Sequence, residues 1–438
     1  MRIFSLKKDD IAQTLKLVRS LNNVSNDIIE TVSKIIEDVK INGNKALIKY
    51  TEKFDGIKLN PDEIKVTPEE INKAHNYVND NELSAAKTLI ENIKKIESKT
   101  IKRLNWSVAL GDITIYQTTK PLESIGCYVP GGKASYPSTL IMTATPAIVA
   151  NVPRIVVTSP PSKITPFFLA VSNMIGVSEI YRVGGAQAIA ALAYGTETIK
   201  PVNKIIGPGN MYVTIAKLLV SKDVMIDMPA GPTELLIVAD ENADATEIAL
   251  DLVAQAEHGT DSLCGLVTVS TELAKRVIKE LSRIINSAER KEIVNRAIEE
   301  KSFIAIADDV TTLQEFVNEL APEHLEVLAK DAYKIIEGIN NAGVIVIGTS
   351  SVITDYYTGV NHVLPTSGYA KLRSGLTILD YIKILRIVSV QNNLSPKIIN
   401  VVRTFAQTEG LSNHFKSIEY RILKERGASN VSQNSTFS

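Results

Sequence analysis

Short apolar runs alternate with helical segments along the middle of the chain, and this alternation constrains the fold more than any other feature. The runs at 154–158, 179–183, 204–206 and 235–239 are rich in Ile, Leu and Val, and each precedes a segment with apolar residues at helical spacing. Strands that alternate with helices in this way lie parallel and are joined by right-handed crossovers. The sequence therefore predicts an α/β fold built on parallel sheets.

The two ends of the chain have a different pattern. Residues 1–100 and 380–425 are charge-rich and have apolar residues three and four positions apart, which is typical of amphipathic helices. At 438 residues the chain is also too long for one ordinary core. We therefore expect two or more domains with helical extensions.

Composition excludes several classes of protein. Charged residues make up 22% of the chain, and 48 Lys and Arg balance 49 Asp and Glu, so no net field attracts nucleic acid or an anionic membrane. Cys127 and Cys264 give no disulfide framework and are expected to be small buried residues. The uncharged stretch 134–153 contains three prolines, so we expect a turn and a buried helix there, not a membrane span. With no apolar signal core over residues 1–7, we expect a cytoplasmic protein.

The segment 243–265 predicts a helix that ends in ligand-capable side chains. Asp244 can cap its start, and Gln255 and His258 are three positions apart, so they share a helix face. Gly259 is predicted to end the helix in the left-handed conformation. An amide oxygen and an imidazole leave the helix end together, which would supply half a metal site. For a histidine taken singly, a structural hydrogen-bonding role is the simpler interpretation.

Glycine-containing turns follow several of the predicted strands, where ligands bind in open α/β sheets. The turn at Gly207-Pro-Gly209 has the first two glycines of the dinucleotide fingerprint Gly-x-Gly-x-x-Gly, but Tyr212 stands in place of the third. A nucleotide phosphate could bind at the start of the helix that follows. Tight turns alone would also explain these glycines.

The pair Glu323-His324 suits acid–base catalysis, because adjacent titratable groups can hold different pKa values when one is buried and the other faces a cleft. A helix start with two polar caps is the alternative interpretation. His258, His362 and His414 also lie near acidic or amide residues, but their spacing matches no zinc finger and no His-Glu-x-x-His motif. A metal site would therefore have to be assembled from distant segments.

Eight segments, taken in order, resemble the blocks of the histidinol dehydrogenase family, and the chain has a similar length. The segments are Gly126–Gly132, Val183–Gly195, Gly207–Asn210, Ala230–Pro232, Gln255–His258, Ala321–Leu325, Asn361–Thr366 and Glu409–His414. The resemblance implies NAD-dependent oxidation of L-histidinol to L-histidine through histidinal, the last steps of histidine biosynthesis, with one Zn²⁺ per subunit.

The resemblance also implies roles for individual residues. His324 would be the general base, and Glu323 would activate water for the aldehyde step. The implied metal ligands are Gln255, His258, Asp355 and His414. These four residues, together with Thr233, His324 and Glu409, would bind the substrate. Tyr128, Gln187 and Asn210 would contact NAD.

For the fold, the resemblance implies two incomplete Rossmann-like parallel-sheet domains with helical N-terminal and C-terminal extensions, in an intertwined homodimer. The segment with Glu409 and His414 would complete the partner's site. We expect an N-terminal helical arm at 1–20, a first α/β domain from 21–125 and 235–378, a second α/β domain at 126–234, and a C-terminal helical segment at 379–438.

The chain departs from the family pattern at four positions. Thr233 stands where Ser is usual, Thr260 where Pro is usual, Leu263 where Gln is frequent and Lys371 where Arg is common. The hydroxyl at position 233 is retained, but its extra methyl could shift substrate affinity. Two other functions are compatible with the residues alone: a zinc-dependent hydrolase or aldolase that uses Glu323, and a non-catalytic nucleotide-binding α/β module.

Overall fold

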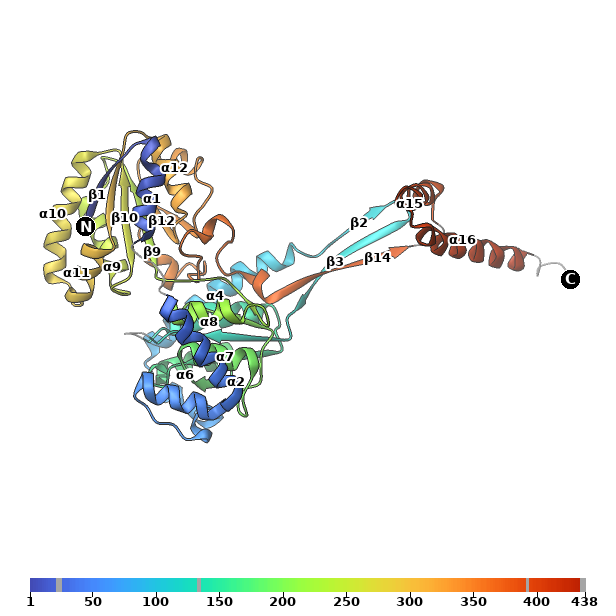
Figure 1. Cartoon of the computed structure of the whole chain (residues 1–438), viewed down its shortest axis with the longest axis horizontal. Helices are drawn as coiled ribbons and strands as arrows, with labels where there is room; N and C mark the ends of the chain where they lie inside the picture. The colour runs from blue at the N-terminus through green and yellow to red at the C-terminus, as the bar shows by residue number, and fades with distance from the viewer. Residues whose placement is uncertain (21–25, 132–134, 391–393, 434–438) are drawn as a thin grey trace. The chain divides into compact units, whose positions relative to one another are not determined.

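The structure is a computed structural model that describes residues 1–20, 26–131, 135–390 and 394–433 (Figure 1). The chain forms two compact units. The larger contains Met1–Ser98 and Pro121–Tyr381, and the smaller contains Lys99–Lys120 and Ile382–Ser438. In the described residues, no helix is both long and apolar enough to span a membrane.

The first sheet of the larger unit has five parallel strands. From edge to edge the strands are β6 (Glu179–Arg182), β5 (Arg154–Ser159), β4 (Ser124–Tyr128), β7 (Lys204–Ile206) and β8 (Met225–Ile226). Its connecting helices are α5 (Pro137–Val149), α6 (Pro166–Ile175), α7 (Gly185–Tyr194) and α8 (Met211–Val220). Counted along the chain, the strand order is 3-2-1-4-5, which is the order of the Rossmann fold.

The second sheet of the larger unit has six strands, all parallel. In spatial order they are β1 (Arg2–Leu6), β11 (Phe303–Ala307), β10 (Leu263–Thr268), β9 (Glu234–Ala239), β12 (His324–Leu328) and β13 (Val344–Ile347). Counted from β9, this sheet also has the order 3-2-1-4-5, with β1 added at one edge. The prediction of parallel sheets with this topology is confirmed.

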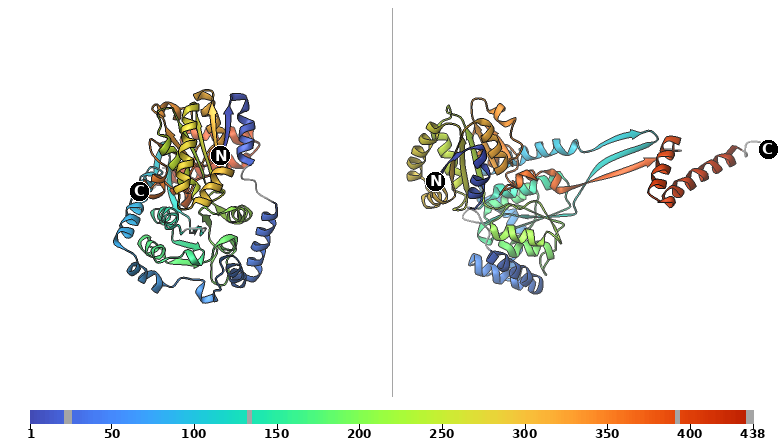
Figure 2. Two further views of the ribbon diagram at one scale, coloured as in Figure 1. Left: turned by 90° about the vertical axis from the view of Figure 1, so that its left-hand side faces the viewer. Right: turned by 45° about the horizontal axis from the view of Figure 1, so that its top comes forward.

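Helices cover both faces of the six-stranded sheet (Figures 1 and 2). One face packs against α1 (Ile11–Arg19), α12 (Val310–Leu320) and α13 (Ala332–Ile336). The other packs against α9 (Ala245–Ala256), α10 (Thr271–Ser287) and α11 (Lys291–Glu300). A sheet buried on both faces needs apolar side chains on both, which is why its strands are nearly continuous apolar runs.

The N-terminal third of the chain is arranged differently from the prediction. Residues 2–6 do not belong to a helical arm, because they form β1 and pair in parallel with β11. The helix α2 (Asn26–Asp55) packs its buried residues against α7 and α8. Residues 26–55 therefore share a core with the five-stranded sheet, and not with 235–378 as expected.

The predicted buried helix in the stretch 134–153 is confirmed. It is α5, which has Pro146 inside it and whose Leu140, Met142 and Ala144 are fully buried. Cys127 and Cys264 are also fully buried, and neither forms a disulfide within the described part of the chain. Burial raises the pKa of both thiols to about 12, so they behave as small apolar residues.

The smaller unit consists of a three-stranded sheet and two helices. Its strands are β14 (Ile382–Val390), β3 (Ile113–Pro121) and β2 (Trp106–Leu110), and its helices are α15 (Pro396–Thr408) and α16 (Ser412–Gln433). The prediction that residues 380–425 are helical throughout is wrong at β14. The sequence there, IKILRIVSV, is rich in β-branched residues, which favour strands.

Many apolar side chains of the smaller unit are exposed. Those of its strands and helices that are more than two-fifths exposed include Trp106, Leu110, Ile384, Val388, Phe405 and Tyr420. Exposed apolar faces of this extent are typical of surfaces that pack against another chain.

Candidate active site

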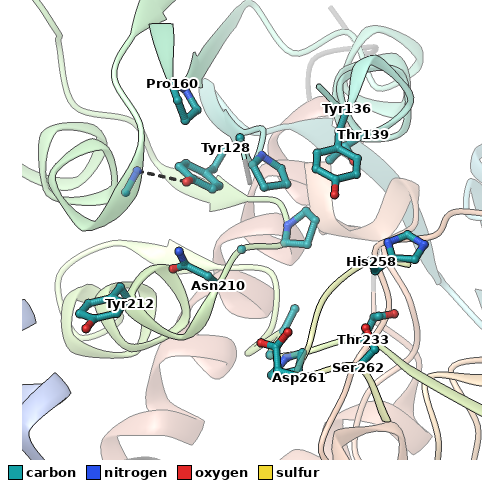
Figure 3. Close-up of a pocket in the computed structure, with 18 of the residues that line it drawn as sticks. Tyr128, Tyr136, Thr139, Pro160, Asn210, Tyr212, Thr233, His258, Asp261 and Ser262 are labelled. Atoms are coloured by element: carbon teal, nitrogen blue, oxygen red, sulfur yellow. Dashed lines mark hydrogen bonds between the residues drawn. The ribbon is translucent and has the colours of Figure 1, made fainter. Parts of the chain in front are cut away.

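A pocket of about 640 Å³ lies in the larger unit and is lined from both of its parallel sheets. The five-stranded sheet contributes the carboxyl ends of its strands, with Tyr128 at the end of β4 and Pro208 just after β7. The six-stranded sheet contributes the amino ends, with Thr233 just before β9, Ser262 just before β10 and His324 at the start of β12. We expected ligands only at the carboxyl ends of the strands, so the wall formed by the amino ends of the six-stranded sheet was not predicted. Figure 3 shows Tyr128 and Asn210 on the left of the pocket, and Thr233 and His258 on the right.

Nine of the eleven predicted site residues line this pocket. They are Tyr128, Gln187, Asn210, Thr233, Gln255, His258, Glu323, His324 and Asp355. The remaining two belong to the smaller unit: Glu409 follows α15, and His414 lies in the first turn of α16. Both are exposed.

Glu323 and His324 form a buried acid–base pair. Oε2 of Glu323 accepts hydrogen bonds from Thr233 Oγ1 and from the backbone N–H of Glu234, both at 2.7 Å. Nδ1 of His324 lies 3.6 Å from the same oxygen and 3.2 Å from the backbone oxygen of Glu234. Nε2 of His324 is buried and has no hydrogen-bond partner among the described residues.

The charge around His324 favours its protonated form. Burial by itself would lower the pKa of this imidazole, but the carboxylates of Glu323 and Asp355 outweigh burial and raise it to about 9. A histidine with one nitrogen anchored and the other directed to a cleft can exchange a proton with a bound molecule.

The hydroxyl of Thr233 joins the acid–base pair to the helix end at Gln255. Thr233 Oγ1 donates to Glu323 and accepts a hydrogen bond of 2.6 Å from Nε2 of Gln255. That bond fixes the orientation of the Gln255 amide and leaves its oxygen to accept from, or coordinate, another group. Both hydrogen bonds of Thr233 use its hydroxyl, which Ser, the usual residue at this position, also has.

The helix end that holds Gln255 and His258 differs in one detail from the prediction. Asp244 caps α9 as expected, accepting a hydrogen bond of 2.7 Å from Thr246 N. The helix ends at Ala256, however, and Glu257 follows in the right-handed conformation. Gly259 does not have a positive φ, so the prediction of a left-handed glycine cap is wrong. A backbone hydrogen bond of 3.3 Å from His258 N to Gln255 O closes the last turn instead.

Asp355 lies beside His362 in the pocket and interacts electrostatically with His258 and His324. Asp355, in α14 (Val352–Tyr356), has Oδ1 3.5 Å from Nδ1 of His362. Burial alone would raise the pKa of Asp355, but His362, His324 and His258 together lower it. Loss of solvation lowers the pKa of His258, although its side chain remains accessible. An ionised carboxylate and a neutral imidazole are the forms that bind a metal ion.

The expected metal ligands in this pocket are therefore an amide, an imidazole and a carboxylate. Within the described ranges, no group of three or more His, Cys, Asp and Glu side chains is arranged to hold a metal. Three of the four predicted ligands, Gln255, His258 and Asp355, line the pocket, and the fourth, His414, belongs to the smaller unit. His362, which we expected to be a packed hydrogen-bonding residue, bonds Thr139 Oγ1 at 3.2 Å and lines the pocket as well.

The other wall of the pocket has features suited to a nucleotide. The hydroxyl of Tyr128 accepts a hydrogen bond of 3.1 Å from Gly185 N, at the start of α7 (Figure 3). Gln187 is 1% exposed, and both polar atoms of its amide lack a partner in the part of the chain that is described. Asn210 caps α8 by accepting from Val213 N at 3.2 Å. A ligand with both donors and acceptors would satisfy this buried amide, as would ordered water.

The fold and the pocket define a Rossmann-type α/β protein with an acid–base pair between its two sheets. The chain matches the family model for histidinol dehydrogenase over residues 18–422. It is 43% identical over 404 residues to the histidinol dehydrogenase of Methanocaldococcus jannaschii, covering 90% of this chain and 93% of that protein. It is 42% identical over 422 residues to that of Clostridium acetobutylicum, covering 95% and 97%.

A solved structure gives the same result. The crystal structure of histidinol dehydrogenase from Elizabethkingia anophelis superposes with a TM-score of 0.90 at 32% identity, covering 97% of this chain and 98% of that one. The chain therefore belongs to the histidinol dehydrogenase family of oxidoreductases, as its sequence blocks predicted.

Proposed function

We propose that this protein oxidises L-histidinol to L-histidine through histidinal, with two NAD⁺ reduced per substrate and one Zn²⁺ per subunit. The observation that best supports the proposal, beside family membership, is His324. Its Nδ1 is anchored against Glu234 O at 3.2 Å, its buried Nε2 has no partner in the described residues, and the residue lines the pocket.

In the alcohol step, His324 is the general base. A Zn²⁺ ion held by Asp355 would offset part of the negative charge that favours protonated His324. In its neutral form, His324 donates its Nδ1–H to Glu234 O and keeps the lone pair on Nε2, which accepts the hydroxyl proton as a hydride leaves the carbinol carbon. NAD⁺ supplies the hydride acceptor. The products of this step are histidinal, NADH and one proton, so atoms and charge balance.

In the aldehyde step, Glu323 is the base that activates water. Oε2 of Glu323 is fixed by Thr233 and Glu234 N, so Oε1 can take a proton from a water that adds to the aldehyde. The resulting hydrate transfers a hydride to a second NAD⁺ and releases one proton, which gives the carboxylic acid and NADH. Keeping both bases in one buried pocket allows the aldehyde to react without leaving.

The metal would be held by Gln255, His258 and Asp355, with His414 of a second copy of the chain as the fourth ligand. The donor set of two imidazoles and two oxygens suits Zn²⁺, and the hydrogen bond from Gln255 to Thr233 leaves the amide oxygen available. When bound, the metal would supply a positive charge that anchors the imidazole and amine of the substrate and orients its carbinol toward His324.

An intertwined homodimer would bring the missing groups to the pocket. Glu409 and His414 are exposed in the smaller unit, and that unit also exposes apolar side chains of β2, β14 and α15. Burial of those side chains against a second copy would stabilise the dimer. In this assembly, Glu409 would contact the substrate next to the metal.

The cofactor would lie along Tyr128, Gln187 and Asn210. The unpartnered amide of Gln187 and the start of α8 next to Asn210 supply donors for a dinucleotide. The two buried thiols fit a reducing, cytoplasmic compartment. We propose neither a nucleic-acid partner nor a membrane partner, since the charge is balanced.

The direct test is to count NADH. Purified protein with limiting L-histidinol should form two NADH per substrate, lose this activity on chelation and regain it when Zn²⁺ is added. Formation of one NADH with accumulation of aldehyde would contradict the proposed role of Glu323. Bond cleavage without NADH would instead support a hydrolase or aldolase, and NAD binding without turnover would support a non-catalytic module.

A further inference from the structure

A fully buried ion pair lies beneath the wall that we assign to the cofactor. Lys217 of α8 and Asp227, which follows β8, are 1% and 0% exposed and are in direct contact. Neither residue lines the pocket. A buried ion pair usually loses more solvation energy than its attraction returns, so apolar residues of the same size would fold at least as well. Stability alone therefore does not explain why Lys217 and Asp227 are buried here.

Both charged groups bind the same glycine. Oδ2 of Asp227 accepts a hydrogen bond of 2.8 Å from Gly207 N, and Nζ of Lys217 donates one of 2.7 Å to Gly207 O. Oδ1 of Asp227 accepts from Met228 N at 2.7 Å, which holds the carboxylate in place. The peptide groups on both sides of Gly207 are thus fixed by charged partners.

Gly207 needs this restraint because of its conformation. Its φ is +122°, and a Cβ at this position would lie 2.1 Å from the backbone oxygen of Tyr128, so only glycine fits. Glycine is also the residue with the greatest backbone freedom. Without its charged partners, the turn would sample other conformations, and the close approach to Tyr128 would be lost.

The turn determines the position of the cofactor wall. Gly207 is followed by Pro208, Gly209 and Asn210, which all line the pocket and lead directly into α8. The same helix also fixes the next turn, since Thr214 Oγ1 donates a hydrogen bond of 2.5 Å to Ala230 O.

From this geometry we infer that Lys217 and Asp227 are positioning residues for the dinucleotide. They hold the Gly207 turn so that Asn210 and the first turn of α8 face the bound cofactor. The inference rests on the proposed NAD-dependent activity, and it assigns a role in that activity to two residues that never touch a ligand.

The test compares three variants with the wild type. Asp227→Leu and Lys217→Met each remove one partner of Gly207, and the double variant with both substitutions removes both charges together. We expect each to raise the KM for NAD⁺ about tenfold or more, with a matching rise in the Kd for NAD⁺ measured calorimetrically without histidinol. The KM for histidinol and the zinc content should stay within about twofold of the wild type.

The double variant separates positioning from stability. A single substitution leaves a charge buried without its partner and can impair folding, whereas the double variant has no such charge. It should melt above the single variants, because no charge is left unpaired, although Gly207 N, Gly207 O and Met228 N lose their partners. Its NAD⁺ affinity should stay low. If melting temperature and NAD⁺ affinity return together, the pair is purely structural and the inference is wrong.

Arg154→Met is a matched control. Arg154 pairs with Glu179 at 2.7 Å in the same sheet, but at the amino ends of β5 and β6, on the edge opposite the pocket. This variant should lose thermal stability without a change in NAD⁺ affinity. An Asp227→Leu variant that folds and binds NAD⁺ as tightly as the wild type would refute the inference. A wild type that binds NAD⁺ but forms no NADH from histidinol would refute only the proposed function.

Discussion

Replacing Thr233 with Val tests whether one hydroxyl couples the proposed aldehyde step to the proposed metal site. The two side chains have nearly the same shape, so the change removes only the hydroxyl. It deletes the 2.7 Å bond to Glu323 and the 2.6 Å bond from Gln255. Both partners lie in buried surroundings, with Gln255 6% and Glu323 7% exposed, so water replaces the lost bonds poorly.

The size of each effect follows from the two bonds. A hydrogen bond to a charged group contributes about 1.5–3 kcal/mol, so the aldehyde step should slow by about 10- to 150-fold when Glu323 loses this donor. Loss of the bond that orients a metal ligand typically weakens metal binding or activity by about 10- to 100-fold. We therefore expect two separate defects from a single isosteric substitution.

Three measurements separate the defects. The rate with histidinal supplied directly reports on Glu323, competition with a chelator reports on metal affinity, and the melting temperature reports on folding. Thr233→Ser is the matched control and should resemble the wild type in all three, because it keeps the hydroxyl. A Val variant that is only less stable, with normal metal affinity and normal rates per folded site, would refute this account of Thr233.

Four further predictions follow from the same pocket. His324→Asn should slow both oxidations while metal content is unchanged, measured as NADH formation from histidinol and histidinal; loss of metal would refute its role as a base. Glu323→Gln should slow mainly the aldehyde step, so equal slowing of alcohol oxidation would contradict the division of roles. Burial raises the pKa of Glu234 from its usual value of 4.5 to about 8, so the folded state holds a proton that the unfolded state releases. Stability should therefore fall as pH rises from about 4.5 to about 8. Glu234→Gln should flatten this fall in melting temperature, and an unchanged slope would contradict the assignment. Mixing His414→Ala and His324→Asn subunits should restore about one quarter of wild-type activity, because half of the random dimers are hybrids with one intact site; no recovery would place His414 in the site of its own chain.

The parallel sheets could be predicted because each of their strands is a short, nearly continuous apolar run. A strand buried on both faces has this signature whatever its partners are. The strands β1 and β14 were missed for a different reason. Arg2–Leu6 becomes a strand by pairing with β11, about 300 residues away, and β14 lies between residues that do have helical spacing. Pairing partners that far apart are not encoded locally.

Most of the pocket residues could be predicted because they lie in the family blocks, and Thr233 because it directly follows one, but their arrangement could not. Nothing in the chain before β9, β10 and β12 indicates that the amino ends of these strands face the pocket. The pair Lys217 and Asp227 was missed since charges ten residues apart normally indicate a solvated surface. Burial of both became visible only when α8 and β8 were placed against the Gly207 turn.

The opposed edges of the two sheets give the pocket an internal electric polarity. The helices α7 and α8 begin at the wall from the five-stranded sheet, so the positive ends of their dipoles lie at the pocket. The helix α9 ends at the wall from the six-stranded sheet, so its negative end lies beside Gln255 and His258. The backbone alone therefore favours an anion such as a diphosphate at one wall and a cation at the other. A dinucleotide and a metal ion would each be drawn to its own side before any side chain makes contact.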